Sequence, residues 1–120
     1  MSQKPGFQAG LQHEDDHRAV IWNLRGRLIG DPLCYEFLES VRAEIDAGRP
    51  NVVLDLGGVD QINSTGLGIL ASIYISSHNH GGRVCLVGVS GRTEQLLDAT
   101  GLRNFMPLCD SVDEALNRHS

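Results

Sequence analysis

The pattern of hydrophobic and polar residues changes several times along the chain between a period of two and a helical period. Between 18 and 26, Val20, Trp22 and Leu24 alternate with other residues and form one apolar face, as in a strand. From 31 to 47, apolar residues recur at helical spacing, with charged residues on the opposite face. The chain as a whole predicts strands at 7–13, 18–26, 51–56, 83–87 and 105–108, and helices at 31–47, 64–80, 92–100 and 111–117.

The order of these elements, ββαβαβαβα, indicates one α/β domain. Strands that alternate with helices pair in parallel through right-handed crossovers, whereas the first two strands, joined by a polar turn, form an antiparallel hairpin. We therefore expect a mixed sheet with an N-terminal hairpin, parallel central strands and about four helices. The domain is expected to span 7–120, after a disordered tail at 1–6.

Two of the helices carry recognisable start signals. Asp31 and Pro32 are typical of an N-cap and a first helical residue. Ser111 and Glu114 match a capping box, in which the side chain of each residue accepts a hydrogen bond from the backbone N–H of the other. These signals support the predicted starts of the first and last helices.

The strand at 51–56 is almost continuously apolar, which is typical of a strand covered on both faces. Gly57 and Gly58 follow and are expected to end it. A short polar loop would then lead to a helix that begins at Ser64 or Thr65. This stretch carries the candidate chemistry of the chain.

Length and charge restrict the classes of function. The chain has 120 residues, enough for one domain with its own core, and 41% of them are hydrophobic. Its formal net charge is -5 and its basic residues are scattered, which argues against a nucleic-acid partner. No apolar run approaches the roughly 20 residues that cross a membrane, and 1–6 lacks the apolar core of a signal peptide. We expect a cytoplasmic protein with no membrane partner.

The cysteines and histidines predict no metal site and no cofactor. Cys34, Cys85 and Cys109 lie far apart in apolar surroundings, so reduced thiols in the core are expected. His78 and His80 have no third ligand within sequence range.

Ser64 and Thr65 form a hydroxyl pair where a helix leaves its first N–H groups unsatisfied and favours negative charge. One interpretation is that they only cap the helix. That interpretation leaves Gly66 and Gly68 unexplained, because each glycine in a first turn costs about 1 kcal/mol relative to alanine. The two glycines indicate that another backbone approaches this end of the helix closely.

A second interpretation is that Ser64 is a catalytic nucleophile. The strand-turn-helix context is similar to the nucleophile elbow of hydrolases, but GxSxG would require glycine where Ile62 stands. No GK[ST] follows a glycine-rich loop, which excludes a P-loop. A serine nucleophile also needs a base, and no reason is evident for any histidine to converge on Ser64. We expect no catalytic residues and no enzymatic activity.

A third interpretation, a phosphorylation and docking site, comes from a family resemblance. The relevant stretches are Leu24-Arg25-Gly26-Arg27-Leu28, Asp55-Leu56, Val59-Asp60, Ile62 to Gly68 with Leu70, Gly82 to Val89, Thr100-Gly101-Leu102, and Val112 with Glu114-Ala115-Leu116. In this order they resemble the STAS domain, and specifically the bacterial anti-sigma-factor antagonists. The resemblance covers about 19–116, nearly the whole chain.

The resemblance implies a partner-switching function. In this family the antagonist binds an anti-sigma factor that is also a serine kinase of the GHKL type, and so frees a sigma factor. Phosphorylation at the helix start ends the capture, and a phosphatase resets it. The acceptor corresponds to Ser64, with Thr65 as the second choice. The resemblance and the small residues of this helix together predict a partner-binding surface made of Asp60, Asn63, Ser64, Thr65, Gly66, Leu67, Gly68 and Ser72.

The sequence departs from the family pattern at two positions and leaves alternatives open. Asn63 stands where aspartate usually precedes the acceptor, and Ile29 stands where aspartate usually follows Gly-x-Leu. A constitutive STAS scaffold in a signalling or lipid-transport complex, without reversible phosphorylation, is therefore the alternative. A monomer or weak dimer is expected, because the exposed edge of the hairpin could pair with another copy.

Overall fold

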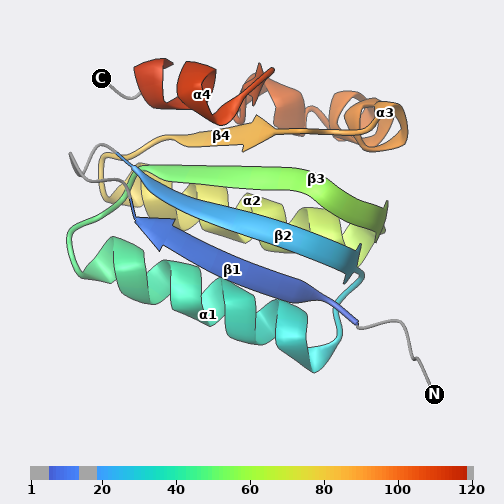
Figure 1. Cartoon of the computed structure of the whole chain (residues 1–120), viewed down its shortest axis with the longest axis horizontal. Coiled ribbons are helices and arrows are strands. Elements are labelled where there is room, and N and C mark those ends of the chain that lie inside the picture. The colour runs from blue at the N-terminus through green and yellow to red at the C-terminus, as the bar shows by residue number, and fades with distance from the viewer. Residues whose placement is uncertain (1–5, 14–18, 119–120) are drawn as a thin grey trace.

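The computed structural model describes residues 6–13 and 19–118, and its elements follow the predicted order (Figure 1). The elements are β1 (Gln8–His13), β2 (Val20–Leu28), α1 (Pro32–Asp46), β3 (Val52–Ile62), α2 (Ser64–Asn79), β4 (Val84–Val87), α3 (Gly91–Thr100), a 3-10 helix (Leu102–Asn104), β5 (Leu108–Cys109) and α4 (Val112–Arg118). The predicted tail at 1–6, apart from Gly6, and the predicted start of the second strand at Arg18 lie outside the described residues.

The five strands form one sheet in the order β1-β2-β3-β4-β5. β1 pairs with β2 in an antiparallel hairpin, and every later pair is parallel, so the predicted mixed sheet is confirmed. Figure 1 shows α1 and α2 on one face of the sheet and α4 over the upper strands on the other. On the face that carries α4, Ile21 of β2 is buried, whereas Asn23 and Arg25 farther along the same strand are exposed.

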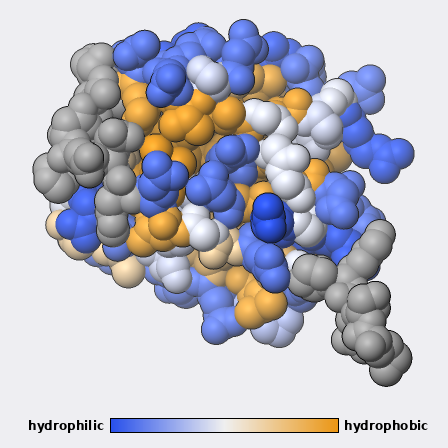
Figure 2. All heavy atoms as spheres, in the orientation of Figure 1, coloured by the Kyte–Doolittle hydropathy of each residue, from blue (hydrophilic) through white to orange (hydrophobic). Residues whose placement is uncertain are grey.

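The hydrophobic core has two parts, one on each side of the sheet. The larger lies between the sheet and the pair α1 and α2, and it includes Trp22, which is 5% exposed. The smaller lies under α4 and includes Ile21 and Val53. Alternate residues of β2 thus enter opposite halves of the core, as the period of a strand requires. In the space-filling view, hydrophobic residues gather beside α4, and polar residues cover much of the remaining surface (Figure 2).

The prediction that the central strand ends at Gly57 and Gly58 is wrong. β3 continues to Ile62, and its second half pairs with β2, which itself runs to Leu28. Gly58 permits this pairing, because a Cβ at that position would lie 2.9 Å from the carbonyl oxygen of Leu24. The glycines therefore allow a close approach of two strands, with shifts in register, instead of a loop.

The C-terminal quarter differs from the predicted boundaries in detail. The last strand is Leu108–Cys109 instead of 105–108, because the 3-10 helix occupies the chain just before it. At α4, Ser111 Oγ accepts a hydrogen bond from the N–H of Glu114 at 3.1 Å, as predicted. Glu114 Oε2 accepts from the N–H of Asp110 at 2.9 Å, one residue before the position of a standard capping box.

Cys34, Cys85 and Cys109 are all buried, which agrees with the prediction of core thiols. Burial raises the pKa of Cys85 to about 12, and the neighbouring Cys109 adds to the shift. A thiol with this pKa is protonated at neutral pH and is a poor nucleophile. Across 6–13 and 19–118, no helix is both long and apolar enough to cross a membrane.

Candidate functional site

The start of α2 follows β3 directly, with Asn63 as the only connecting residue. The Oδ1 atom of Asn63 accepts a hydrogen bond from the N–H of Gly66 at 2.9 Å, so Asn63 is the N-cap. Its Nδ2 atom donates to the carbonyl oxygen of Ile29 at 3.2 Å and so connects α2 to the segment before α1. The capping role, which was one interpretation of Ser64 and Thr65, therefore belongs to Asn63.

Ser64 and Thr65 are exposed at the first two positions of α2. Within the described residues, neither hydroxyl makes a hydrogen bond. The two side chains differ in their surroundings. The methyl group of Thr65 packs against Gly30, where a Cβ would lie only 2.4 Å from it and where φ is +99°. Thr65 is thus held by a contact with the loop before α1, whereas the hydroxyl of Ser64 is free to rotate into solvent.

The two glycines of the first turns have different surroundings. A Cβ on Gly66 would lie 2.0 Å from the carbonyl oxygen of Leu28, so α2 approaches the end of β2 too closely for any side chain. A Cβ on Gly68 would meet nothing within 4 Å. The close backbone approach predicted from the sequence is therefore found inside the domain at Gly66, and only Gly68 offers open space to a partner.

The other residues of the predicted surface also divide into exposed residues and residues packed inside the domain. Asp60 is exposed on the last part of β3, and Ser72 is half-buried on α2. Leu67 belongs to the larger core. The accessible part of the predicted surface thus consists of Asp60, Asn63, Ser64, Thr65 and Gly68, with Ser72 at its margin.

Sequence reasoning missed one residue of this surface. Ile75 is 56% exposed, and its spacing from Ser64 and Gly68 places the three residues along one side of α2. An exposed isoleucine is informative beside small residues, since together they form a surface that a partner can approach. The signal was hidden because α2 is apolar on most sides, so no residue stands out in its pattern.

The exposed hydroxyl of Ser64 is the group of this site that could react. No histidine or carboxylate forms a hydrogen bond to Ser64 in the described part of the chain, whereas a serine nucleophile is normally paired with a base. No group of three potential metal-ligating side chains occurs among the described residues either. The free N–H groups and the dipole of the helix start favour a negative group on Ser64.

Asn63→Ala is expected to lower the free energy of unfolding by about 1 kcal/mol, because the cap of α2 is lost. Ser64→Ala is the matched control and should change it by less than about 0.5 kcal/mol, since no hydrogen bond is removed. Urea-induced unfolding of both variants measures the difference. Equal losses in the two variants would contradict the assignment of the cap.

Comparisons with known proteins identify related sequences. Residues 13–115 match the family model described as the STAS domain. The anti-sigma F factor antagonist of Paenibacillus polymyxa is 30% identical over 111 residues, which cover 88% of this chain and 92% of that protein. An anti-sigma factor antagonist homologue of Thermotoga neapolitana is 32% identical over 72 residues. That alignment covers 60% of this chain and 64% of the relative, slightly less than two-thirds of its length.

Solved structures show the same fold. An anti-sigma factor antagonist from Mycobacterium paratuberculosis superposes with a TM-score of 0.79 at 24% identity and covers 98% of this chain and 97% of its own. The Bacillus cell fate determinant SpoIIAA in its phosphorylated form has a TM-score of 0.68 at 19% identity. The superposition covers 94% of this chain and 100% of the SpoIIAA chain. At these identities the likeness establishes the architecture.

Proposed function

The chain belongs to the STAS domain family, among relatives that are anti-sigma-factor antagonists, and we propose that phosphorylation of Ser64 controls its binding to an anti-sigma factor. The observation that carries this proposal is the free, exposed hydroxyl of Ser64 on a helix start that Asn63 already caps. A phosphoryl group can be added there without breaking a contact of the domain.

The phosphate is expected to affect the bound partner more than the domain itself. A phosphate adds about -1.5 to -2 charges near neutral pH, and a helix N-terminus stabilises such a group. The domain itself therefore needs no refolding. A partner packed closely against Ser64 and the open space at Gly68 would meet new bulk and charge, and its capture would be lost.

We infer the partners from the resemblance to the anti-sigma-factor antagonists. An anti-sigma factor that is also a GHKL-type serine kinase would phosphorylate Ser64, and a phosphatase would reverse the step. The unphosphorylated chain would bind that kinase and release a sigma factor in the cytoplasm, acting as a binding protein and not as an enzyme. The phosphorylated form of the solved Bacillus relative supports the idea that this fold accepts the modification.

The first test is phosphorylation in vitro by an anti-sigma kinase encoded in the same genome, with ATP, followed by mass spectrometry of the peptides. Phosphate is expected on Ser64, and Ser64→Ala should abolish its incorporation. Thr65→Ala should leave incorporation intact, because Thr65 is held against Gly30.

The second test is the affinity for the same kinase, measured by calorimetry. Ser64→Asp is expected to weaken binding about 100-fold or more, equivalent to about 2.7 kcal/mol, whereas Ser64→Ala should bind as the unmodified chain does. Asn79→Asp, which adds one charge at the other end of α2, is the matched control and should bind normally. Absence of phosphate together with undiminished binding by Ser64→Asp would refute the switch and favour the constitutive scaffold.

A further inference from the structure

We propose that the groove between β1 and α1 is a second docking site, which binds an extended peptide segment of a partner by adding it as a strand beside β1. The segment would carry apolar side chains on the face toward α1 and a basic residue that reaches Glu36. This proposal concerns a surface separate from Ser64 and does not depend on the phosphorylation switch.

The first observation is the free edge of the sheet. β1 is the outermost strand, and β2 is its only partner among the described strands. Its residues from Gln8 to Gln12 are all exposed. An edge strand presents unpaired N–H and C=O groups, and proteins commonly protect such an edge with proline or lysine. The sequence of β1, QAGLQH, contains neither. The backbone of β1 is thus available to pair with another strand.

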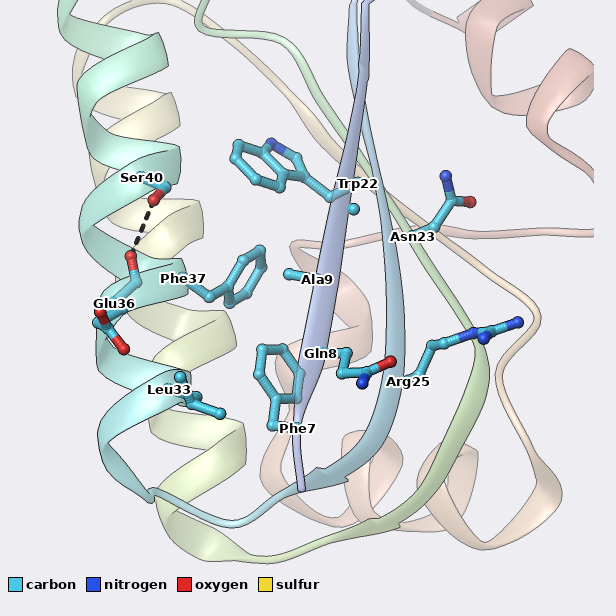
Figure 3. Close-up of a pocket in the computed structure, with 11 residues that line it drawn as sticks. Phe7, Gln8, Ala9, Trp22, Asn23, Arg25, Leu33, Glu36, Phe37 and Ser40 are labelled. Carbon is cyan, nitrogen blue, oxygen red and sulfur yellow. Dashed lines mark hydrogen bonds between the residues drawn. The ribbon is translucent and has the colours of Figure 1, made fainter. Parts of the chain in front are cut away.

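The second observation is an apolar groove beside that edge. A hollow of about 750 Å³ lies between β1, β2 and α1. Figure 3 shows Phe7, Trp22 and Phe37 gathered at its floor, with Ala9 on β1 and Leu33 on α1 at its sides. Leu33 is 49% exposed, and Leu11, farther along β1, is 42% exposed. Ala9 is small enough to leave the hollow open, so side chains of an added strand can enter it.

The free edge and the groove together indicate what kind of ligand would bind, namely an extended strand with apolar side chains on one face. In strand addition, backbone hydrogen bonds hold the peptide, and alternate side chains enter pockets on one face. Alternate side chains of a strand added beside β1 would point toward α1, as Ala9 does. These positions should be apolar, because the floor is made of aromatic rings whose faces and edges favour such contacts.

The third observation is the charge at the groove. Glu36 on α1 and Arg25 on β2 both belong to the lining of the hollow; Glu36 lies at its outer rim on α1, and Arg25 extends to the opposite face of the sheet (Figure 3). Among the described residues, the carboxylate of Glu36 has no ion-pair partner. A basic residue of the peptide would supply one. The chain has a formal net charge of -5, so a second copy would bring like charge to this edge, and charge complementarity favours a different, basic partner over self-pairing.

The fourth observation is an unpaired polar group in the floor. Trp22 is 5% exposed, and its Nε1–H has no hydrogen-bond partner within the described part of the chain. Buried indole N–H groups usually have an acceptor. Trp22 is also the single tryptophan of the chain, so its fluorescence reports on the groove.

The test uses the full chain and a defined probe, a capped seven-residue peptide with threonine at odd positions and leucine, valine and lysine at the even ones. We expect a shift of the Trp22 emission with a Kd of about 100 μM or lower, an affinity typical of short segments. In NMR titrations the amide signals of Gly10 and Leu11 should move, and those of Ser64 and Gly68 should not.

Three variants separate the groove from the rest of the surface. Ala9→Phe fills the hollow and should weaken binding at least tenfold, whereas Gln12→Phe, on the opposite face of β1 and outside the lining of the hollow, should leave it within about twofold. Glu36→Lys should weaken binding of the lysine peptide by about two- to fivefold and strengthen binding of a peptide with glutamate in place of lysine by a similar factor.

Several results would overturn the proposal. They are no change of the β1 amide signals at about 1 mM peptide, unchanged binding by Ala9→Phe, or the same affinity for the lysine and glutamate peptides. Self-association in analytical ultracentrifugation that Leu11→Lys abolishes would also overturn it, because another copy would then occupy the edge. Circular dichroism of each variant establishes that the fold is retained.

Discussion

Gly66→Ala is expected to lower the free energy of unfolding by about 3 kcal/mol, at the upper end of the range for overpacking. The added Cβ would lie 2.0 Å from the carbonyl oxygen of Leu28 and 2.9 Å from Cγ1 of Ile62. The carbonyl group of Leu28 is part of the backbone at the end of β2 and cannot rotate away as a side chain can. α2 would have to move off the sheet, and its packing against the core would suffer.

The matched control lies two residues farther along the same helix. Gly68→Ala meets nothing within 4 Å, so it should raise the free energy of unfolding by about 0.5 to 1 kcal/mol through helix propensity. Urea-induced unfolding of the two variants should therefore give changes of opposite sign. Two changes of the same sign would show that helix propensity, or a shift of α2, outweighs the contact with Leu28.

The second large effect is expected from Phe37→Ala, at about 3 to 5 kcal/mol of lost stability. Phe37 is buried on α1, and its ring centroid lies 5.4 Å from that of Phe7 and 5.5 Å from that of Trp22. It joins α1 to the segment before β1 and to β2, so its removal leaves a cavity where three segments meet. The cost depends on how far α1 can move inward to fill the space.

Tyr35→Ala provides the control for that variant on the same helix. Tyr35 is 48% exposed, so its removal should change the free energy of unfolding by about 0.5 kcal/mol or less. Thermal and urea unfolding measure both variants, and the Trp22 emission of Phe37→Ala should shift to longer wavelength as water reaches the indole. A loss of 1 kcal/mol or less in Phe37→Ala would mean that the floor of the groove repacks readily.

The helices were the most predictable elements, because their signals are local. Asp31 does cap α1, with its Oδ1 accepting from the N–H of Cys34 at 3.2 Å, and the αL residue Gly101 does follow α3. A cap, a proline or a terminal glycine acts within four residues of the boundary that it sets. Such features can be found in a sequence without knowledge of the tertiary contacts.

The errors in the fold arose where distant segments meet. Gly58 was expected to end a strand, yet it continues β3 because the backbone of Leu24 lies beside it. Gly66 was expected to face a partner, yet it faces Leu28 of the same chain. A glycine in a sequence indicates a close approach, but only the topology shows which backbone approaches.

The position of the candidate site at the start of α2 could be predicted from the sequence, but which of its residues are exposed could not. The free hydroxyl of Ser64 lies where the sequence placed it, at the first residue of α2. The division of the surface into exposed Gly68 and Ile75 and buried Leu67 depends on how α2 is rotated against the sheet. The groove beside β1 depends on residues from three elements, so no local pattern could indicate it.

The contact between Thr65 and Gly30 affects how the proposed switch would respond to its enzymes. With Thr65 held, each molecule would carry one phosphate or none, and multiply modified intermediates would not accumulate. The fraction of active antagonist would then depend directly on the ratio of kinase to phosphatase rates. Gly30→Ala should disturb this arrangement, because it displaces the threonine and would give the kinase a second substrate hydroxyl. Molecules with no, one or two phosphates would then occur together, and the fraction of active antagonist would no longer depend on a single modification.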